Sequence, residues 1–254
     1  MLKSSIYCAG STRASRFAAT YLKSLNLPIV DTTGEHVAHL LLDIPSLGPE
    51  GQLRGGGSVD KLLESVSDDV VIYGGNLTHP SFQKFKTVDF LRNPAYLAEN
   101  AYITAECALD VALPYLDITL RDCPVLIIGW GRIGKCLGSL LKNIGADVTI
   151  AARKESDRAM IHALGYRSED TAQLEDSLSH YRLIFNTAPE PVLSAQQTAL
   201  CHPACVKIEL ASKDGICGDD VITARGLPGI HMPESSGKLI AHTFLKYYQK
   251  EETP

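Results

Sequence analysis

Short apolar runs alternate with segments of helical periodicity along most of this chain. Apolar runs typical of buried strands occur in the first half at 5–10, 28–30, 37–43, 69–74 and 87–90. The segment after the first run repeats apolar side chains at helical spacing, namely Phe17, Tyr21, Leu22 and Leu25. Strands that alternate with helices predict a parallel sheet covered by helices.

A glycine-rich turn lies at the centre of the second half. The apolar run 125–128 leads into Gly129-Trp130-Gly131-Arg132-Ile133-Gly134, a helical pattern follows, and a second apolar run spans 147–151. In a dinucleotide-binding turn the first glycine supplies the backbone angles, the second admits a pyrophosphate and the third lets helix and strand pack closely. Amides at the helix start, including those of Arg132 and Ile133, would bind the phosphates. The pattern predicts a dinucleotide site, with a tight turn in another α/β unit as the alternative.

The end of the second apolar run indicates which dinucleotide to expect. NAD-specific sites carry an acidic residue there, whereas a site for the 2′-phosphate needs cations. This chain has Ala151-Ala152-Arg153-Lys154. Two adjacent cations can pair with a phosphate, so we expect NADP(H), and a solvated basic turn is the alternative.

The order of the elements predicts an α/β fold with two parallel-sheet domains. We expect a Rossmann dinucleotide-binding domain at 119–234 and a smaller flavodoxin-like domain at 1–93, completed by a C-terminal helix at 235–254. A helical pattern at 94–118 would connect them. Two connecting helices predict a hinge beside a cleft that closes over cofactor and substrate.

Composition narrows the class of protein. The chain has 254 residues, 45% of them apolar, and a net charge of −5 without a basic run, which disfavours nucleic acid and anionic membranes as partners. No apolar run is as long as a membrane span and no secretory segment is evident, so we expect a cytoplasmic protein. Seven scattered cysteines suit a reducing compartment. Cys201 and Cys205 have metal-like spacing but lack a second pair of ligands, so we expect no metal.

Several motifs resemble those of the family of the dipicolinate synthase A subunit and, more distantly, those of D-2-hydroxyacid dehydrogenases. The similarity covers nearly the whole chain and is strongest from 100 to 241. The motifs that carry it are Asn100 with Thr104 and Glu106, the glycine turn, Ala152-Arg153, Asn186-Thr187-Ala188-Pro189, Leu210-Ala211-Ser212-Lys213, and Gly226-Leu227-Pro228-Gly229-Ile230 followed by Pro233 and Gly237. The chain departs from the family in a shortened first domain and in Lys213, which stands where the family has arginine.

The resemblance implies an NADP-dependent oxidoreductase that converts a dihydrodipicolinate-type intermediate to dipicolinate during sporulation. It also implies the flavoprotein-like B subunit of dipicolinate synthase as a possible partner, while a homo-oligomer is left open. Alternatives are an NADPH-dependent reductase of another imine or 2-oxo acid, and a non-catalytic subunit that binds NADP(H). In either the dehydrogenase or the reductase, hydride transfer is the cofactor's chemistry, and the protein supplies orientation and charge.

Candidate ligand contacts follow from the motifs and the expected strand ends. Asn186, Thr187 and Ala188 would contact the nicotinamide end of the cofactor, or else form a capped turn. The substrate carboxylates would meet cations and helix starts, for which the candidates are Lys213, Arg13 beside Ser11 and Thr12, and Ser235 with Ser236. Pro228 and Gly229 would form a wall over the nicotinamide, or a plain turn. The loop 45–58 would either touch substrate or be a surface loop.

The proton acceptor is the least determined role. Histidine titrates near neutrality, and His231 follows the Gly-Leu-Pro-Gly motif, although a structural role is the alternative. Glu106 on the connecting helix would orient a partner group or pack the helix. Glu234 occupies the place of the catalytic histidine of D-2-hydroxyacid dehydrogenases, which disfavours lactate-type chemistry.

Overall fold

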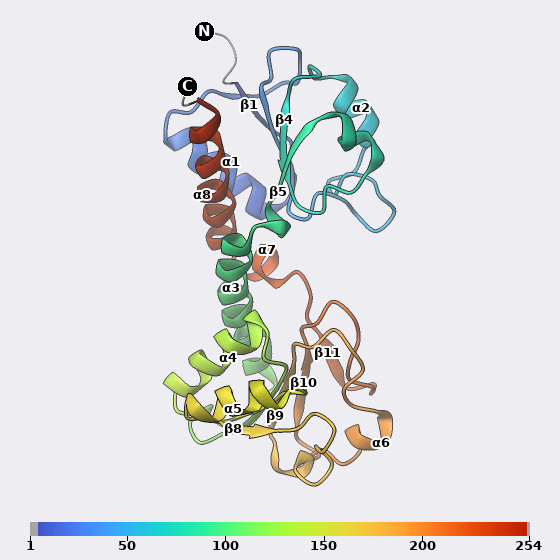
Figure 1. The fold of residues 1–254 in the computed structure, drawn as a ribbon, viewed down its shortest axis with the longest axis vertical. Helices are drawn as coiled ribbons and strands as arrows, with labels where there is room; N and C mark the ends of the chain where they lie inside the picture. The colour runs from blue at the N-terminus through green and yellow to red at the C-terminus, as the bar shows by residue number, and fades with distance from the viewer. Residues whose placement is uncertain (1–4, 253–254) are drawn as a thin grey trace. The chain divides into compact units, whose positions relative to one another are not determined.

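The computed structural model describes residues 5–252, which divide into two compact units (Figure 1). The first unit contains the chain up to Asn100 and again from Pro228 onward, and the second contains Ala101–Leu227. Each unit is built on its own parallel sheet, which confirms the predicted fold class. Within the described residues, no helix combines the length and hydropathy needed to cross a membrane.

The first unit holds a five-stranded sheet in the order β2-β1-β3-β4-β5. Every neighbouring pair is parallel, and the order is that of flavodoxin-like folds. The strands are β1 (Ile6–Cys8), β2 (Ile29–Val30), β3 (His39–Leu41), β4 (Val71–Gly74) and β5 (Lys86–Asp89). The helices are α1 (Arg13–Ser24), α2 (Val59–Glu64), the 3₁₀ turns η1 (Pro80–Lys84) and η2 (Phe90–Arg92), and α8 (Pro233–Glu252).

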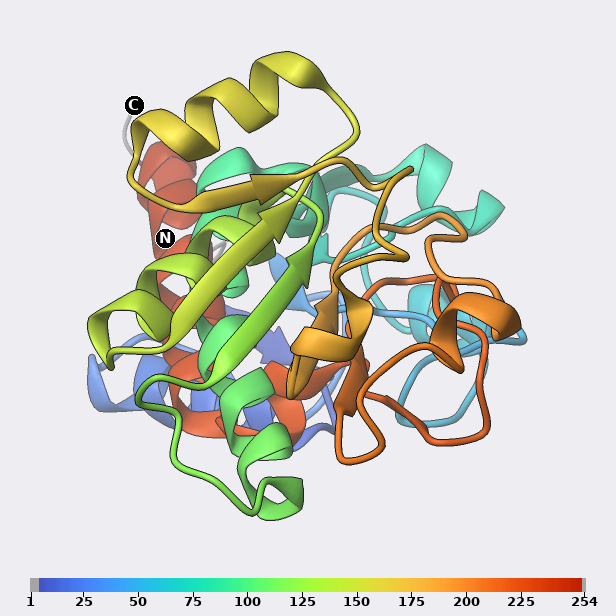
Figure 2. The same cartoon turned by 90° about the horizontal axis from the view of Figure 1, so that it is seen from below.

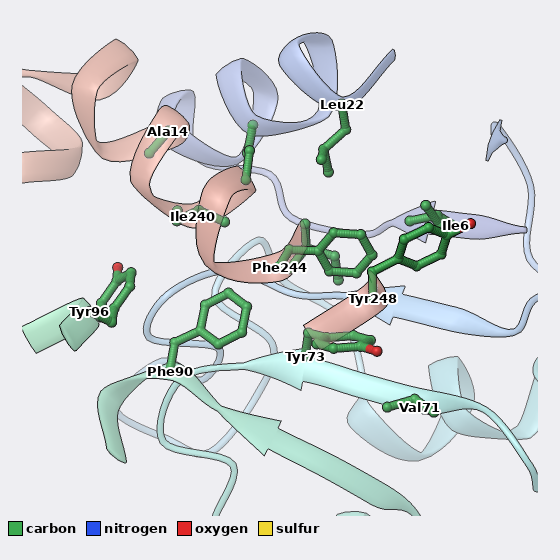
Figure 3. Packing of buried hydrophobic residues seen from close by; sticks show 13 residues of the cluster. Ile6, Ala14, Leu22, Val71, Tyr73, Phe90, Tyr96, Ile240, Phe244 and Tyr248 are labelled. Atoms are coloured by element: carbon green, nitrogen blue, oxygen red, sulfur yellow. The ribbon is translucent and has the colours of Figure 1, made fainter. Parts of the chain in front are cut away.

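One face of this sheet is covered by α1 and α8, which come from opposite ends of the chain. Figure 3 shows Phe244 and Tyr248 of α8 above Tyr73 of β4, and the ring centroids of Tyr73 and Phe244 are 4.7 Å apart. The two helices pack closely at Gly237, where an added Cβ would lie only 2.6 Å from the carbonyl oxygen of Ala14. The C-terminal helix therefore completes the core of the first unit.

The buried face of α1 differs from the expected one. Phe17 and Leu25 are exposed, whereas Ala14, Ala18 and Leu22 are buried. Small residues face α8 because the close approach of the two helices leaves no room for large side chains. The helix itself was predicted correctly, but of its apolar pattern only Leu22 and Tyr21 contact the core.

The second unit holds a six-stranded sheet in the order β11-β10-β9-β6-β7-β8. All its pairs are parallel, and β6, β7 and β8 lie side by side in Figure 2. This is the Rossmann order, with the chain reversing direction across the sheet beside β6. The strands are β6 (Pro124–Ile128), β7 (Asp147–Ala151), β8 (Arg167–Glu169), β9 (Leu183–Asn186), β10 (Val206–Glu209) and β11 (Val221–Thr223). The helices are α4 (Arg132–Asn143), α5 (Glu155–Ala163), α6 (Ala195–Thr198) and the 3₁₀ turn η4 (Leu178–His180).

Three further helices lie near the boundaries of the units. The helix α3 (Pro94–Ala112) continues into the 3₁₀ turn η3 (Leu113–Tyr115), and the boundary between the units falls within α3. The segment with Pro228 and Gly229 is a one-turn helix, α7 (Leu227–His231), preceded by Gly226 at φ 65°, which corrects the alternative of a plain turn. Likewise α8 begins at Pro233, two residues before the expected start.

Candidate functional site

The glycine turn after β6 has the geometry that its three glycines predict. Gly129 has φ 109°, and a Cβ there would lie 2.5 Å from Oγ1 of Thr187. A Cβ at Gly134 would collide with the carbonyl oxygen of Gly129. By contrast, no atom lies within 4 Å of a Cβ built on Gly131. Gly129 and Gly134 are thus required by the turn itself, whereas Gly131 leaves open space beside the backbone.

The helix that follows this turn, α4, begins without a side-chain cap. Gly131 is the N-cap residue, so no side chain bonds the first amides, and the first turn contains no acidic residue. The first helical hydrogen bond runs from the amide of Lys135 to the carbonyl of Gly131 at 3.0 Å. The amides of Arg132, Ile133 and Gly134 therefore have no acceptor within the helix and lie where a phosphate binds in Rossmann turns.

The start of α1 in the first unit has a different environment. The buried carboxylate of Asp43 accepts hydrogen bonds from Oγ of Ser15 at 2.6 Å, Oγ1 of Thr12 at 2.7 Å and the amide of Ser11 at 3.0 Å. Burial alone would raise the pKa of Asp43, but these hydrogen bonds outweigh it and hold the pKa below its ordinary value. An internal carboxylate thus accepts from Ser11 and Thr12, which were expected to meet a ligand carboxylate, while the role of the exposed Arg13 stays a prediction.

A pocket of about 440 Å³ opens beside the glycine turn, wholly within the second unit. Its walls come from loops at the carboxyl ends of parallel strands, where Rossmann folds bind nucleotides. The lining residues are Gly129, Trp130, Ala152, Arg153, Lys154, Asp157, Thr171, Ala172, Ala188, Pro189, Glu190, Pro191 and Val192. Eight of the expected cofactor residues thus lie at the pocket or the adjoining helix start: Gly129, Gly131, Arg132, Ile133, Gly134, Arg153, Lys154 and Ala188.

The charged side chains of this pocket carry both signs. Nη1 of Arg153 lies 3.0 Å from Oε2 of Glu190 in the loop after β9. Lys154 is the N-cap residue of α5, and Asp157 lies in the first turn of that helix. The sequence predicted the two cations but neither carboxylate, and Glu190 in particular is 37 residues from the arginine that it meets.

Arg158 donates hydrogen bonds to the backbone of the loop that carries Arg153. Its Nη1 donates to the carbonyl oxygens of Ala152 at 2.9 Å and Arg153 at 2.8 Å, and its guanidinium also pairs with Asp170 at 2.9 Å. This supporting residue was missed, since an arginine in the first turns of a helix carries no distinctive sequence signal. Its contacts fix the loop after β7 against the loop after β8.

The loop after β9 is fixed by buried polar contacts. Asn186 is 0% exposed, and its Nδ2 donates to the buried carboxylate of Glu209 at 2.9 Å and to the carbonyl of Ala188 at 3.0 Å. Asn186 therefore shapes the loop, which corrects the expected contact with a ligand and matches the alternative of a capped turn. Oγ1 of Thr187 donates to the carbonyl of Ile128 at 3.0 Å and braces the glycine turn.

The remaining candidate residues are divided between the units. Lys213 is exposed in the loop after β10, and Glu106 is half-buried on α3, both in the second unit. The first unit holds Arg13, exposed at the start of α1, together with Pro228, Gly229, His231, Ser235 and Ser236.

One of these placements, that of Ser236, differs from the sequence expectation. Ser236 is buried, and its amide donates to the carbonyl of Met232 at 3.0 Å, so it lies inside α8 and not at a free helix start. Pro228 is buried, while His231 is exposed at the end of α7. The loop 45–58 approaches α1 so closely that a Cβ at Gly55 would collide with Oγ of Ser11.

Within the described residues, no group of three or more His, Cys, Asp and Glu side chains is placed to hold a metal ion. Near Cys201 and Cys205, Nζ of Lys207 donates to the carbonyl oxygen of Cys205 at 3.1 Å. Lys207 in turn pairs with Asp220 at 2.8 Å.

Known proteins resemble this chain in sequence and in fold, although no family model matches it. The A subunit of dipicolinate synthase from Bacillus subtilis (strain 168) is 26% identical over 238 residues, which cover 89% of this chain and 77% of that protein. The structure of the same subunit from Bacillus halodurans aligns with a TM-score of 0.84 and 20% identity, covering 98% of this chain and 99% of that one. A transhydrogenase from Sinorhizobium meliloti aligns with a TM-score of 0.72 and 12% identity, covering 97% and 94%. The predicted resemblance is therefore confirmed: along most of its length this chain is similar to the A subunit of dipicolinate synthase.

Proposed function

We propose that this chain is an NADP(H)-dependent oxidoreductase that oxidises a dihydrodipicolinate-type dicarboxylate to dipicolinate, in the cytoplasm and during sporulation. The observation that carries the proposal is the uncapped start of α4 beside a pocket lined by Arg153 and Lys154. A dinucleotide needs both features, because its pyrophosphate seeks free amides and its 2′-phosphate seeks cations.

The residues of the second unit fit such a group. The open space beside Gly131 leaves the backbone accessible to a pyrophosphate, which the amides of Arg132 and Ile133 would hold. Arg153 and Lys154 would hold the 2′-phosphate. When bound, the dinucleotide supplies hydride transfer, and the protein contributes position and charge.

The cofactor preference is tested by neutralising the two cations. Trp130 is the one tryptophan of the sequence and lines the pocket, so its emission reports on bound nucleotide. We expect NADPH to bind at least about tenfold more tightly than NADH, and R153Q with K154Q to remove most of that preference while NADH affinity changes little. Equal affinities in the unaltered chain would contradict the choice of NADP(H).

The substrate class rests on the likeness to the A subunit of dipicolinate synthase and on one further cation. Lys213 follows β10, so it lies at the carboxyl edge of the sheet, on the edge where the glycine turn also lies. We propose that it pairs with a substrate carboxylate in the place where the family has arginine. A single ammonium lacks the bidentate fork of a guanidinium, so K213R should retain activity and K213M should raise KM more than it lowers kcat.

The reaction itself is tested by supplying the lysine-pathway precursor with NADP⁺ and measuring dipicolinate by its absorbance. Parallel assays with and without the flavoprotein-like B subunit of dipicolinate synthase test whether that partner is needed. Tight NADPH binding with no dipicolinate in either assay would refute the proposed reaction and leave a nucleotide-binding subunit.

A further inference from the structure

One ion pair joins the two loops that flank the nucleotide pocket. Arg153 follows β7, Glu190 follows β9, and Nη1 of the arginine lies 3.0 Å from Oε2 of the glutamate. Both residues line the pocket. The side chain of Arg153 is 73% exposed and that of Glu190 is 62% exposed, so the pair is solvated.

This pairing affects the two forms of the dinucleotide differently. A 2′-phosphate carries up to two negative charges and competes with the Glu190 carboxylate for the guanidinium of Arg153. It is also repelled by Glu190 at short range. A 2′-hydroxyl is neutral, and its binding leaves the ion pair free to persist.

The loops around the pair limit how far it can rearrange. The carbonyl of Arg153 is held by Arg158, so the backbone on the β7 side is fixed and only the side chain of Arg153 can turn toward a ligand. On the other side, Glu190 is followed by Pro191, whose ring restricts the glutamate backbone to extended conformations. Exchange of the carboxylate for a phosphate therefore proceeds by side-chain rotation.

We propose that Glu190 is a specificity-determining residue that pairs with Arg153 in the nucleotide-free protein and so reduces the preference for NADP(H) over NAD(H). The inference rests on the proposed cofactor site, since it assigns Arg153 to the 2′-phosphate. An exposed ion pair is weak, so the glutamate moderates the preference without abolishing it.

The test measures dissociation constants of NADPH and NADH for E190Q by the emission of Trp130, with calorimetry as a second readout. We expect NADPH affinity to rise about two- to fivefold, NADH affinity to change less than about 1.5-fold, and the gain to shrink at high salt. The matched control is D219N, which removes one exposed carboxylate next to the amino end of β11, at the opposite edge of the same sheet. This control should leave both affinities unchanged.

A double-mutant cycle distinguishes the ion pair between Glu190 and Arg153 from simple repulsion of the 2′-phosphate by Glu190. If Glu190 acts by holding Arg153, the gain from E190Q should be largely lost when Arg153 is already glutamine. The same gain in both backgrounds, no gain in either, or an equal rise for NADH would overturn the inference. Failure of the cofactor assignment looks different, because the unaltered chain would then bind neither nucleotide or would bind NADH more tightly.

Discussion

Two helix starts in this chain differ in a few residues, and the difference separates a structural site from the proposed ligand site. At α1 the carboxylate of Asp43 accepts hydrogen bonds from Ser11, Thr12 and Ser15, so the positive end of the helix dipole already has its anion. At α4 Gly131 offers no side chain, and the corresponding amides are left for a ligand.

Asp43 should contribute to stability in a pH-dependent way. Because its pKa is held below the ordinary 3.8, its stabilising contribution is present above that value and is lost as the pH falls through the depressed pKa. D43N leaves the donors of Ser15 and Thr12 without a charged acceptor and should cost about 1–3 kcal/mol near neutral pH. Urea unfolding at several pH values, followed by far-UV circular dichroism, measures both effects.

The emission of Trp130 provides the internal control, since this residue belongs to the second unit. We expect D43N to shift the circular dichroism transition while the Trp130 transition stays in place. A variant as stable as the unaltered chain at neutral pH, or equally sensitive to acid, would contradict the role given to Asp43.

At the scale of elements, α1 and α8 are packed through small residues. A Cβ at Gly237 would meet backbone atoms of Ala14 and Ala18 at 2.6 and 2.9 Å, and backbone atoms cannot move aside as side chains do. G237V should therefore push the helices apart and destabilise the first unit by about 1–3 kcal/mol or more. The unfolding transition measured by circular dichroism should move to lower urea.

The comparison for this prediction is G229A in α7, where no atom lies within 4 Å of the added Cβ. G229A should unfold close to the unaltered chain. Equal behaviour of G237V and G229A would show that close helix packing at Gly237 is not required.

Sequence reasoning succeeded where the physical cause is local and failed where it is distant. The glycine turn, the strands around it and the cations after β7 follow from neighbouring residues, and all occur as expected. Glu190 meets an arginine 37 residues away, and Asp43 meets Thr12 at a separation of 31. Such contacts depend on which strands become neighbours in the sheet, and composition and spacing do not specify that order.

The same reason explains the misplaced ligand contacts. Asn186 ends a strand, which suggested an exposed amide, but its partner Glu209 ends the neighbouring strand β10 and draws the amide into the interior. The exposure of Phe17 was not anticipated because the partner helix α8, against which Ala14 and Ala18 pack, lies more than two hundred residues further along the chain. Local pattern identified these elements, and tertiary pairing decided what their side chains do.

At the scale of the whole molecule, the proposed nucleotide binding belongs to the second unit and depends on an uncapped helix start. That unit contains the glycine turn, the pocket, the cations and their supporting arginine. The likeness to the A subunit of dipicolinate synthase extends over both units, so the proposed reaction concerns the full chain.

The most direct measurement is a titration of the unaltered chain and of G131A with NADPH, followed by the emission of Trp130. Gly131 has φ −78° and open space around its missing Cβ, so alanine fits the free protein and should lower the melting temperature by only a few degrees. The same methyl group would stand where a pyrophosphate must approach the backbone. We expect the unaltered chain to bind NADPH, and G131A, still folded, to bind it at least about tenfold more weakly. Undiminished NADPH binding by folded G131A, or no binding by the unaltered chain, would contradict the proposed site.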